Sequence, residues 1–506
     1  MFHKKILCLG NETQATNTIV TDLAFTNNTI NHGLIFADHF VPIHPGYYHT
    51  TIADVSPGGI IRELAQYFDL IVMLDQDVDS YPHWKSFVNT FRLMIDLEKK
   101  EFNTDFKNNK GNQNIIYWHD LLRTNKSLCL YPFINLINDY GSAVMCQKNS
   151  TPLTKIESII DWSTDPAFMP IRNNMIDGIL NPDKCFGCYE REKLSGESTR
   201  NFESLEWAIN LKLTNKEDLK NIKHPVLYEI RPSNKCNMMC RMCNDRHSHL
   251  IEQENKKIGF PITTDRWKFQ DFPYHKIDFS TVNRIYWAGG EPTIMPEFYA
   301  FLRRCIEQNQ TNFDLSIGTN GQKISNLLLD LLDEFPRVNF SVSFDGYKKI
   351  NDYIRWGSDF DTVRQNCFRM LEKGHHLAFQ TVPSIYNATR LHEVYEFYDR
   401  EFPGCNTLAQ PAGLISHYLG PWHNPLRQQV LESMYRCKDT KVYHNCGRNS
   451  NHLVDEIIDH YENYECDLDL LARFFQYNDK LDQSRSSCLI DYIPELEQAR
   501  SFISKL

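Results

Sequence analysis

Three cysteines lie close together in the stretch SNKCNMMCRMCN, which covers residues 233–244. Cys236, Cys240 and Cys243 are separated by three residues and then by two. Two ordinary explanations are free thiols buried as small apolar side chains and a zinc site, but zinc normally takes four ligands in a closed tetrahedral shell. An odd triplet better suits a metal centre with one open position, because three thiolates can hold three irons of a [4Fe-4S] cluster.

Four further cysteines form a second candidate ligand set. Cys129 and Cys146 have the spacing C-x16-C, and Cys185 and Cys188 form the pair CFGC. The first two are predicted at the ends of a hairpin, with INLIND as one strand, a DYG turn that contains Gly141, and SAVMC as the returning strand. Four thiolates can close the shell of a metal centre, and on spacing alone both zinc and [4Fe-4S] are possible.

Composition limits the class of protein. The chain has 506 residues, so we expect two to four domains. Its net charge of -10 argues against broad binding of nucleic acid or of anionic membranes. No apolar run approaches the roughly 20 residues that span a bilayer, and the first residues lack the pattern of a signal peptide. We therefore expect a cytoplasmic protein, in which the eight scattered cysteines are ordinary thiols.

Alternating strands and helices must position the first cysteine group. From about residue 225 the sequence predicts six strand and helix units in succession, which indicate a parallel sheet curled into a barrel or partial barrel. Chemistry on such a sheet occurs at the carboxyl ends of the strands. The cysteine triplet follows the first strand, VLYEIR, and the turn AGGEP follows the second, RIYWAG. GTNG and SFDG follow the third and fourth strands, so all four turns are expected to line one site.

The order of these motifs resembles the radical S-adenosylmethionine superfamily. The likeness covers residues 225 to about 412, where CxxxCxxC follows the first strand and GGEP follows the second. It implies a partial (β/α)6 barrel in which Cys236, Cys240 and Cys243 hold a [4Fe-4S] cluster. It also implies that the amino and carboxylate groups of S-adenosylmethionine chelate the open iron.

The resemblance further implies which residues contact this cofactor. They are Met242, Gly289, Gly290, Glu291, Pro292, Asn320, Ser343 and Arg355. The GGEP turn is expected to meet the methionine amino group, while Asn320 and Ser343 face the ribose and the carboxylate. Arg355 resembles the arginine that pairs with the carboxylate in the peptide-modifying branch. Met242 occupies a position that is usually aromatic, so packing on the adenine is expected to differ here.

The second cysteine set resembles that of a twitch domain, a shortened SPASM domain that holds an auxiliary [4Fe-4S] cluster. Carried over by position, Cys129, Cys146, Cys185 and Cys188 would ligate that cluster. In the relatives this domain follows the barrel, whereas here it precedes it. Methylthiotransferases that modify transfer RNA also carry an N-terminal auxiliary cluster, but with three cysteines and a basic tail. The four-cysteine pattern and the negative net charge disfavour that alternative.

Four regions are therefore predicted within an α/β chain. They are an N-terminal α/β domain of unknown role at 1–110, a twitch-like α+β domain at 120–205, the radical SAM partial barrel at 225–425 and a helical region at 426–506.

The predicted function is reductive cleavage of S-adenosylmethionine to a 5′-deoxyadenosyl radical, which abstracts a substrate hydrogen. The expected outcome is oxidation or cross-linking of a ribosomal peptide, or oxidation of a small molecule. The resemblance implies two [4Fe-4S] clusters, an electron donor of the flavodoxin or ferredoxin type, and a peptide or small-molecule substrate. The auxiliary cluster would conduct electrons, because four protein thiolates leave it no open iron. A non-catalytic iron–sulfur or zinc scaffold is the rival of another class, and the GGEP turn argues against it. The sequence identifies no hydrogen or proton acceptor.

Overall fold

A computed structural model of the chain describes only part of the first 116 residues, namely four short strands. Beyond them it describes residues 117–118, 120–147, 151–195, 198–262, 276–409, 424–445, 454–455, 457–458, 461–462 and 467–504. The described chain forms two compact units. One comprises residues 1–134 and 163–223, and the other comprises residues 135–162 and 224–506.

Two apolar runs near the N-terminus, KKILCLG and DLIVMLD, predict buried strands, and the structure has a strand in each. β1 (Ile6–Leu9) falls in KKILCLG and pairs in parallel with β4 (Leu70–Met73), which falls in DLIVMLD. β2 (Leu34–Ile35) and β3 (Phe40–Val41) form a short antiparallel pair. Between these runs, GGIIRELAQYF predicts a helix, and the polar stretch at 99–114 predicts a linker; both lie outside the described residues.

The rest of the first unit is helical. Its helices are α7 (Tyr131–Ile134), α8 (Met169–Asp177), α9 (Pro182–Ser195) and α10 (Thr199–Asn210). Gly178 ends α8 with a left-handed backbone (φ 78°), which separates α8 from α9. Ser198 begins α10 with a capping box that includes Asn201. A short 3-10 helix, η3 (Lys216–Asn221), leads to the second unit.

The second unit contains the predicted parallel sheet. In the described part of the chain, one sheet of nine strands has the order β15-β14-β12-β11-β10-β8-β5-β6-β7. The six predicted barrel strands are β8 (Leu227–Arg231), β10 (Arg284–Trp287), β11 (Asp314–Thr319), β12 (Arg337–Ser343), β14 (His376–Thr381) and β15 (Asn406–Ala409). Each pairs in parallel with its neighbour, and the arrangement is a partial barrel.

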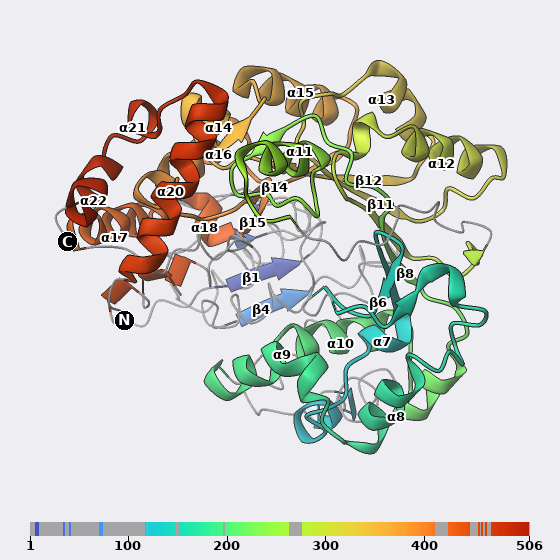
Figure 1. Cartoon of the computed structure of the whole chain (residues 1–506). Helices are drawn as coiled ribbons and strands as arrows, with labels where there is room; N and C mark the ends of the chain where they lie inside the picture. The colour runs from blue at the N-terminus through green and yellow to red at the C-terminus, as the bar shows by residue number, and fades with distance from the viewer. Residues whose placement is uncertain are drawn as a thin grey trace, which may run out of the picture. The chain divides into compact units, whose positions relative to one another are not determined.

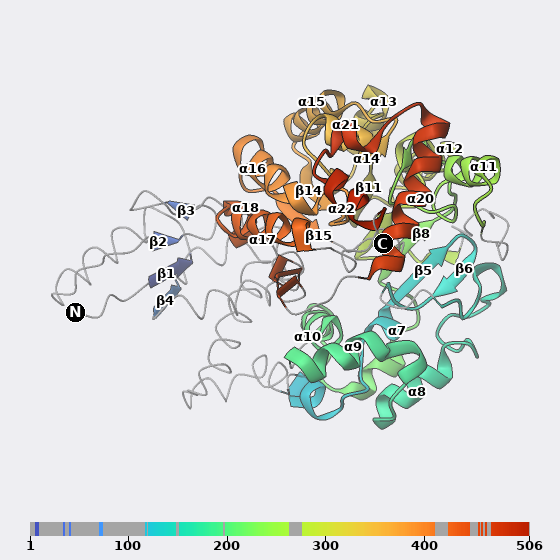
Figure 2. The ribbon, with the colours of Figure 1, turned by 60° about the vertical axis from the view of Figure 1, so that its left-hand side comes forward.

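The predicted hairpin extends this sheet at its first strand. β5 (Asn135–Asp139) pairs in parallel with β8, and β6 (Ser142–Val144) and β7 (Thr154–Lys155) continue in antiparallel order. Figure 2 shows β5 and β6 beside β8. The compact units thus group the hairpin with the barrel, whereas the sequence grouped it with the helices that follow; the predicted domain boundaries stay a prediction.

Alternation along the strands explains the two faces of the sheet. In β12, Val338, Phe340 and Val342 are buried, while the residues between them are partly exposed. β11 and β14 show the same alternation. Helices cover the buried face, as Figure 1 shows for three of them; these helices are α12 (Pro296–Glu307), α13 (Asn326–Leu332), α15 (Phe360–Glu372) and α16 (Leu391–Glu401). The other face is polar, as expected for a barrel interior that receives a substrate.

Helices follow the last barrel strand, as predicted for the C-terminal region. They include α17 (Asn424–Lys438), α18 (Lys441–Asn445), α20 (Leu468–Arg485), α21 (Leu489–Tyr492) and α22 (Leu496–Ile503). α20 lies beside α11 (His249–Ile258), the helix that follows the cysteine triplet. No helix of the described residues is long and apolar enough to cross a membrane.

Candidate active site

The cysteine triplet lies in the loop that leaves the carboxyl end of β8, where the sequence placed it. Within this loop, β9 (Met239–Cys240) pairs antiparallel with β13 (Arg355–Trp356), so that Cys240 lies opposite Arg355. The backbone N–H of Arg241 donates to the carbonyl of Ile354 at 2.7 Å. The loop is therefore fixed at its centre by the chain that follows β12.

The three thiols lie close enough to influence one another. Burial raises the pKa of Cys236 to about 12, and the neighbouring Cys240 adds to that shift. Burial also raises the pKa of Cys243, with further contributions from Cys240 and Cys236. Because thiolates in such a site repel one another, they form together only with a cation among them. Among the described residues, no three His, Cys, Asp or Glu side chains already stand in a metal-binding arrangement.

The two glycines of the GGEP turn pack against the backbone of the cysteine loop. A Cβ on Gly290 would lie 2.2 Å from the carbonyl oxygen of Lys235, and one on Gly289 would lie 2.7 Å from that of Ser233. The N–H of Gly290 donates to the Ser233 carbonyl at 2.9 Å. The sequence predicted that these glycines let the backbone approach a ligand; the close approach seen here is to the neighbouring loop.

Glu291 is buried and its carboxylate is bonded within the protein. One oxygen accepts from the hydroxyls of Thr293 at 2.7 Å and Thr319 at 2.6 Å, and from the Thr293 N–H at 3.2 Å. The other accepts from the N–H of Asn320 at 2.6 Å. Burial raises the pKa of Glu291, and these hydrogen bonds oppose the shift. The side chain thus joins the turn after β10 to the end of β11, and the following Pro292 begins a buried 3-10 turn.

Asn320 connects the third turn to the cysteine loop. Its side-chain amide donates to the Oδ1 of Asn237 at 2.8 Å, between the first and second cysteines. Ser343 is the last residue of β12 and lies partly exposed on the polar face of the sheet. Met242 is buried, with 8% of its surface exposed. These residues border the same strand ends as the triplet, as the resemblance implied; their contacts with a cofactor stay a prediction.

Arg355 is buried next to the triplet. Its Nη1 donates to Oδ2 of Asp345 at 2.5 Å, and Asp345 is itself fully buried at the end of β12. Burial raises the pKa of Cys240, and the Arg355 charge opposes that shift. The Nε–H of Arg355 is buried without a hydrogen-bond partner. An unsatisfied guanidinium N–H is costly to bury, so it fits a site that receives an anionic ligand.

The polar face of the sheet adds residues that the sequence analysis did not single out. Glu229 and Arg231 of β8 form an ion pair, and Arg231 also pairs with Asp139 of the hairpin at 3.4 Å. Tyr286 of β10 occupies space that Gly318 of β11 leaves open, because a Cβ there would lie 2.5 Å from the Tyr286 hydroxyl. The period of two in DLSIGT and RVNFSVS was the available signal, since its polar positions define this face.

The second cysteine set is divided between the two compact units. Cys129, Cys185 and Cys188 belong to the first unit, and Cys146 follows β6 in the second. Cys185 and Cys188 lie three residues apart on α9, within the helix rather than after it. Burial raises the pKa of Cys185 to about 11. Buried Arg200 donates to the carbonyl of Leu128 at 2.6 Å, which ties the loop before Cys129 to α10.

Comparison with known proteins identifies the barrel. Residues 230–397 match the family model described as the Radical SAM superfamily. Among solved structures, anSMEcpe with bound AdoMet is 19% identical over 42% of this chain and 59% of that chain, with a TM-score of 0.33. SuiB of Streptococcus suis bound to S-adenosylmethionine is 16% identical over 59% of this chain and 60% of that chain, with a TM-score of 0.30. A comparison with the curated proteins gave no match.

The described residues thus combine a partial barrel with parallel strands and a loop of three cysteines at the carboxyl end of β8. Residues 230–397, the part of the chain that the family model matches, are a radical SAM domain. The chain matches about three fifths of the length of the anSMEcpe and SuiB structures. The family implies a [4Fe-4S] cluster and S-adenosylmethionine, and the residues fit both: the three thiols are soft ligands, and Arg355 has an unpaired donor beside them.

Proposed function

We propose that the chain is a radical SAM enzyme that modifies a peptide or a small molecule. Cys236, Cys240 and Cys243 would hold the cluster, which would pass one electron from an external donor for the cleavage of S-adenosylmethionine to methionine and a 5′-deoxyadenosyl radical. The single observation that carries the proposal is the grouping of these thiols at the carboxyl edge of a sheet that matches the family model.

Residues of the chain prepare the site for this chemistry. Arg355 has a buried donor that suits the carboxylate of the cofactor, while Asp345 fixes the orientation of its guanidinium. The GGEP turn and Asn320 hold the cysteine loop against the ends of β10 and β11. The apolar face of the sheet is sealed by helices, so access to the strand ends is from the polar face.

The second cysteine set supports an auxiliary cluster as a further part of the proposal. Each iron of that cluster would be bound by one thiolate, from Cys129, Cys146, Cys185 or Cys188. No iron would then be open to substrate, so the cluster would pass electrons. An electron donor of the flavodoxin or ferredoxin type would then serve the enzyme. A peptide is a practical first substrate to test, since one compared structure is SuiB bound to precursor peptide SuiA, at 15% identity and a TM-score of 0.28.

The test measures iron and cofactor cleavage together. Anaerobically reconstituted protein should hold about eight irons per chain, and with dithionite it should form 5′-deoxyadenosine. Cys240→Ala should form none, because the cluster that provides the electron loses a ligand. Zinc in place of the second set of irons would remove the auxiliary cluster from the proposal. Absence of 5′-deoxyadenosine from iron-loaded wild type would favour the non-catalytic scaffold.

A further inference from the structure

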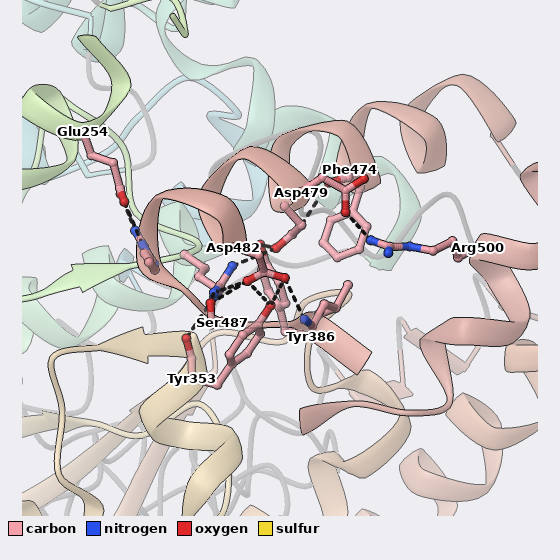
Figure 3. Close-up of polar contacts among 12 residues, drawn as sticks. Glu254, Tyr353, Tyr386, Phe474, Asp479, Asp482, Ser487 and Arg500 are labelled. Carbon is pink, nitrogen blue, oxygen red and sulfur yellow. Dashed lines mark hydrogen bonds and ion pairs between the residues drawn. The ribbon is translucent and has the colours of Figure 1, made fainter. Parts of the chain in front are cut away.

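The C-terminal helix α20 makes buried polar contacts with the cysteine loop. Arg241, which separates Cys240 from Met242, is fully buried and pairs with Asp482 of α20 at 2.6 Å. Its guanidinium also lies 3.7 Å from the centroid of the Tyr353 ring. Figure 3 shows Asp482 at the centre of this network, where it also accepts from the Tyr353 hydroxyl at 3.0 Å. The helix is therefore part of the wall around the loop.

Arg485, the last residue of α20, is the second buried cation of this wall. Its Nε donates to Glu254 of α11 at 2.8 Å, and its Nη2 bonds the other carboxylate oxygen, so the pair is bidentate. The guanidinium carbon lies 5.6 Å from the centroid of Trp356, the neighbour of Arg355 in β13. In Figure 3, Glu254 extends from α11 toward α20.

One donor of Arg485 has no partner. Its side chain is 1% exposed, yet its Nη1 is buried without a hydrogen bond. Arg355 shares this property through its Nε. Both cations lie at the centre of this loop: Arg355 is opposite Cys240 in the β9–β13 pair, and Arg485 lies against Trp356, the next residue of β13. An unsatisfied guanidinium donor is costly to bury, so the free donor of Arg485, next to this loop, indicates that a thiolate-bound centre is the anionic group it serves.

We propose that Arg485 is a positioning residue of the cluster site: Glu254 orients its guanidinium, and its unpaired donor supplies a fixed positive charge beside Cys240. This inference rests on the proposed function. Reduction adds a negative charge to the cluster, so a fixed cation nearby stabilises the reduced form and raises the reduction potential. Glu254 weakens this effect, because its negative charge partly compensates the cation.

The experiment is a redox titration of the reconstituted full chain, followed by electron paramagnetic resonance of the cluster that responds to S-adenosylmethionine. Arg485→Gln removes the charge and should reduce the equilibrium constant for reduction of the cluster about tenfold. For one electron this lowers the midpoint potential by about 59 mV. Glu254→Gln leaves the cation uncompensated and should shift the potential in the opposite direction. Arg485→Lys keeps the charge and should lie close to the wild type.

Arg500→Gln is the matched control. Arg500 of α22 also pairs with a carboxylate of α20, Asp479, lies over an aromatic ring, Phe475, and has a buried Nε without a hydrogen bond, but its side chain is 31% exposed. The midpoint potential of the cluster should not change in Arg500→Gln. The inference is overturned if Arg485→Gln leaves the potential unchanged at full iron content, or if it and Glu254→Gln shift the potential in the same direction.

Loss of folding does not obscure the outcome. Iron content and circular dichroism identify a variant that fails to assemble. If Arg485→Gln fails to assemble, the midpoint potentials of Arg485→Lys and Glu254→Gln test the inference. Their expected results are a near-normal and a raised potential, and any other pair of results contradicts the inference. Wild-type protein without iron, or without cleavage of S-adenosylmethionine, would instead contradict the proposed function itself.

Discussion

The two cysteine sets of this chain differ in how their surroundings are built. Cys236, Cys240 and Cys243 lie in one loop that is bonded on several sides, by β13, by the turns after β10 and β11, and by α20. The second set has two members on one helix, a third in a preceding loop, and a fourth in the other compact unit.

The difference indicates how strongly each site depends on the rest of the fold. A loop whose ligands are neighbours in sequence needs only a strand end and a few backbone contacts to be placed. A set distributed over residues 129–188 has its members in separate elements, so its placement depends on much more of the chain. We expect the two sets to respond differently to the loss of a ligand.

The largest expected difference concerns the two halves of the reaction. Replacing Cys185 and Cys188 together by serine should leave cleavage of S-adenosylmethionine near the wild-type rate, while little or no oxidised product forms. The reason is that the electron-conducting centre would be lost while the triplet and its loop remain. The measurement compares the amounts of 5′-deoxyadenosine and of oxidised product that form in the same anaerobic reaction, with a precursor peptide as the first substrate.

Cys488→Ser is the control for this double variant, because Cys488 is an exposed thiol outside both sets. Circular dichroism and retained iron at the triplet must first show that the double variant is folded. Product formed at the wild-type rate would make the second site structural. Loss of cleavage in a folded variant would mean that the triplet receives its electron through the second site.

Glu291→Ala tests whether the GGEP turn acts on the fold or on the cofactor. The carboxylate accepts four hydrogen bonds from buried groups, and its removal leaves the Asn320 N–H without this acceptor. We expect the free energy of unfolding in urea to fall by about 3 kcal/mol. Glu297→Ala, at an exposed position of α12, should change it by less than about 0.5 kcal/mol. Unchanged stability with weakened binding of S-adenosylmethionine would return Glu291 to the role that the resemblance implied.

Local sequence patterns predicted most of the barrel. All six strands were identified from short apolar or alternating runs, because such runs depend only on the period of a strand. The triplet was predicted for a similar reason, since its ligands are neighbours in the chain. The role of α20 could not be predicted: Arg241 and Asp482 are separated by 241 positions, and no local pattern indicates that they pair.

The hydrogen bonds that the GGEP residues make within the protein also could not be predicted from the sequence. A motif indicates which residues gather at a site, but not whether Glu291 points toward a ligand or toward Thr319. The pairing of β5 with β8 is a similar case. The hairpin was predicted from its own residues, whereas its addition to the barrel sheet depends on an edge strand more than eighty residues away.

The smallest expected effect concerns a hydrogen bond between the hairpin turn and the chain that leaves the cysteine loop. The hydroxyl of Tyr140 lies 2.7 Å from Nδ1 of His247. Tyr140→Phe removes this bond and should lower the free energy of unfolding by about 1 kcal/mol near pH 7. The substitution keeps the ring that packs beside His247, so a much larger loss would mean that the turn itself has rearranged.

The same pair predicts a dependence of stability on pH. Burial, aided by the Arg231 charge, lowers the pKa of His247 to about 4 from its ordinary value of 6.5. Between these values the unfolded chain binds a proton that the folded chain does not, so stability is full above pH 6.5 and falls as the pH drops toward 4. His392, whose burial also lowers its pKa to about 4, contributes over the same range.

His247→Gln should therefore reduce the slope of unfolding free energy against pH without abolishing it, while the exposed control His224→Gln should leave it unchanged. An unaltered slope in His247→Gln would show that the imidazole is accessible to protons in the folded protein, and that the hairpin turn does not seal this side of the cysteine loop.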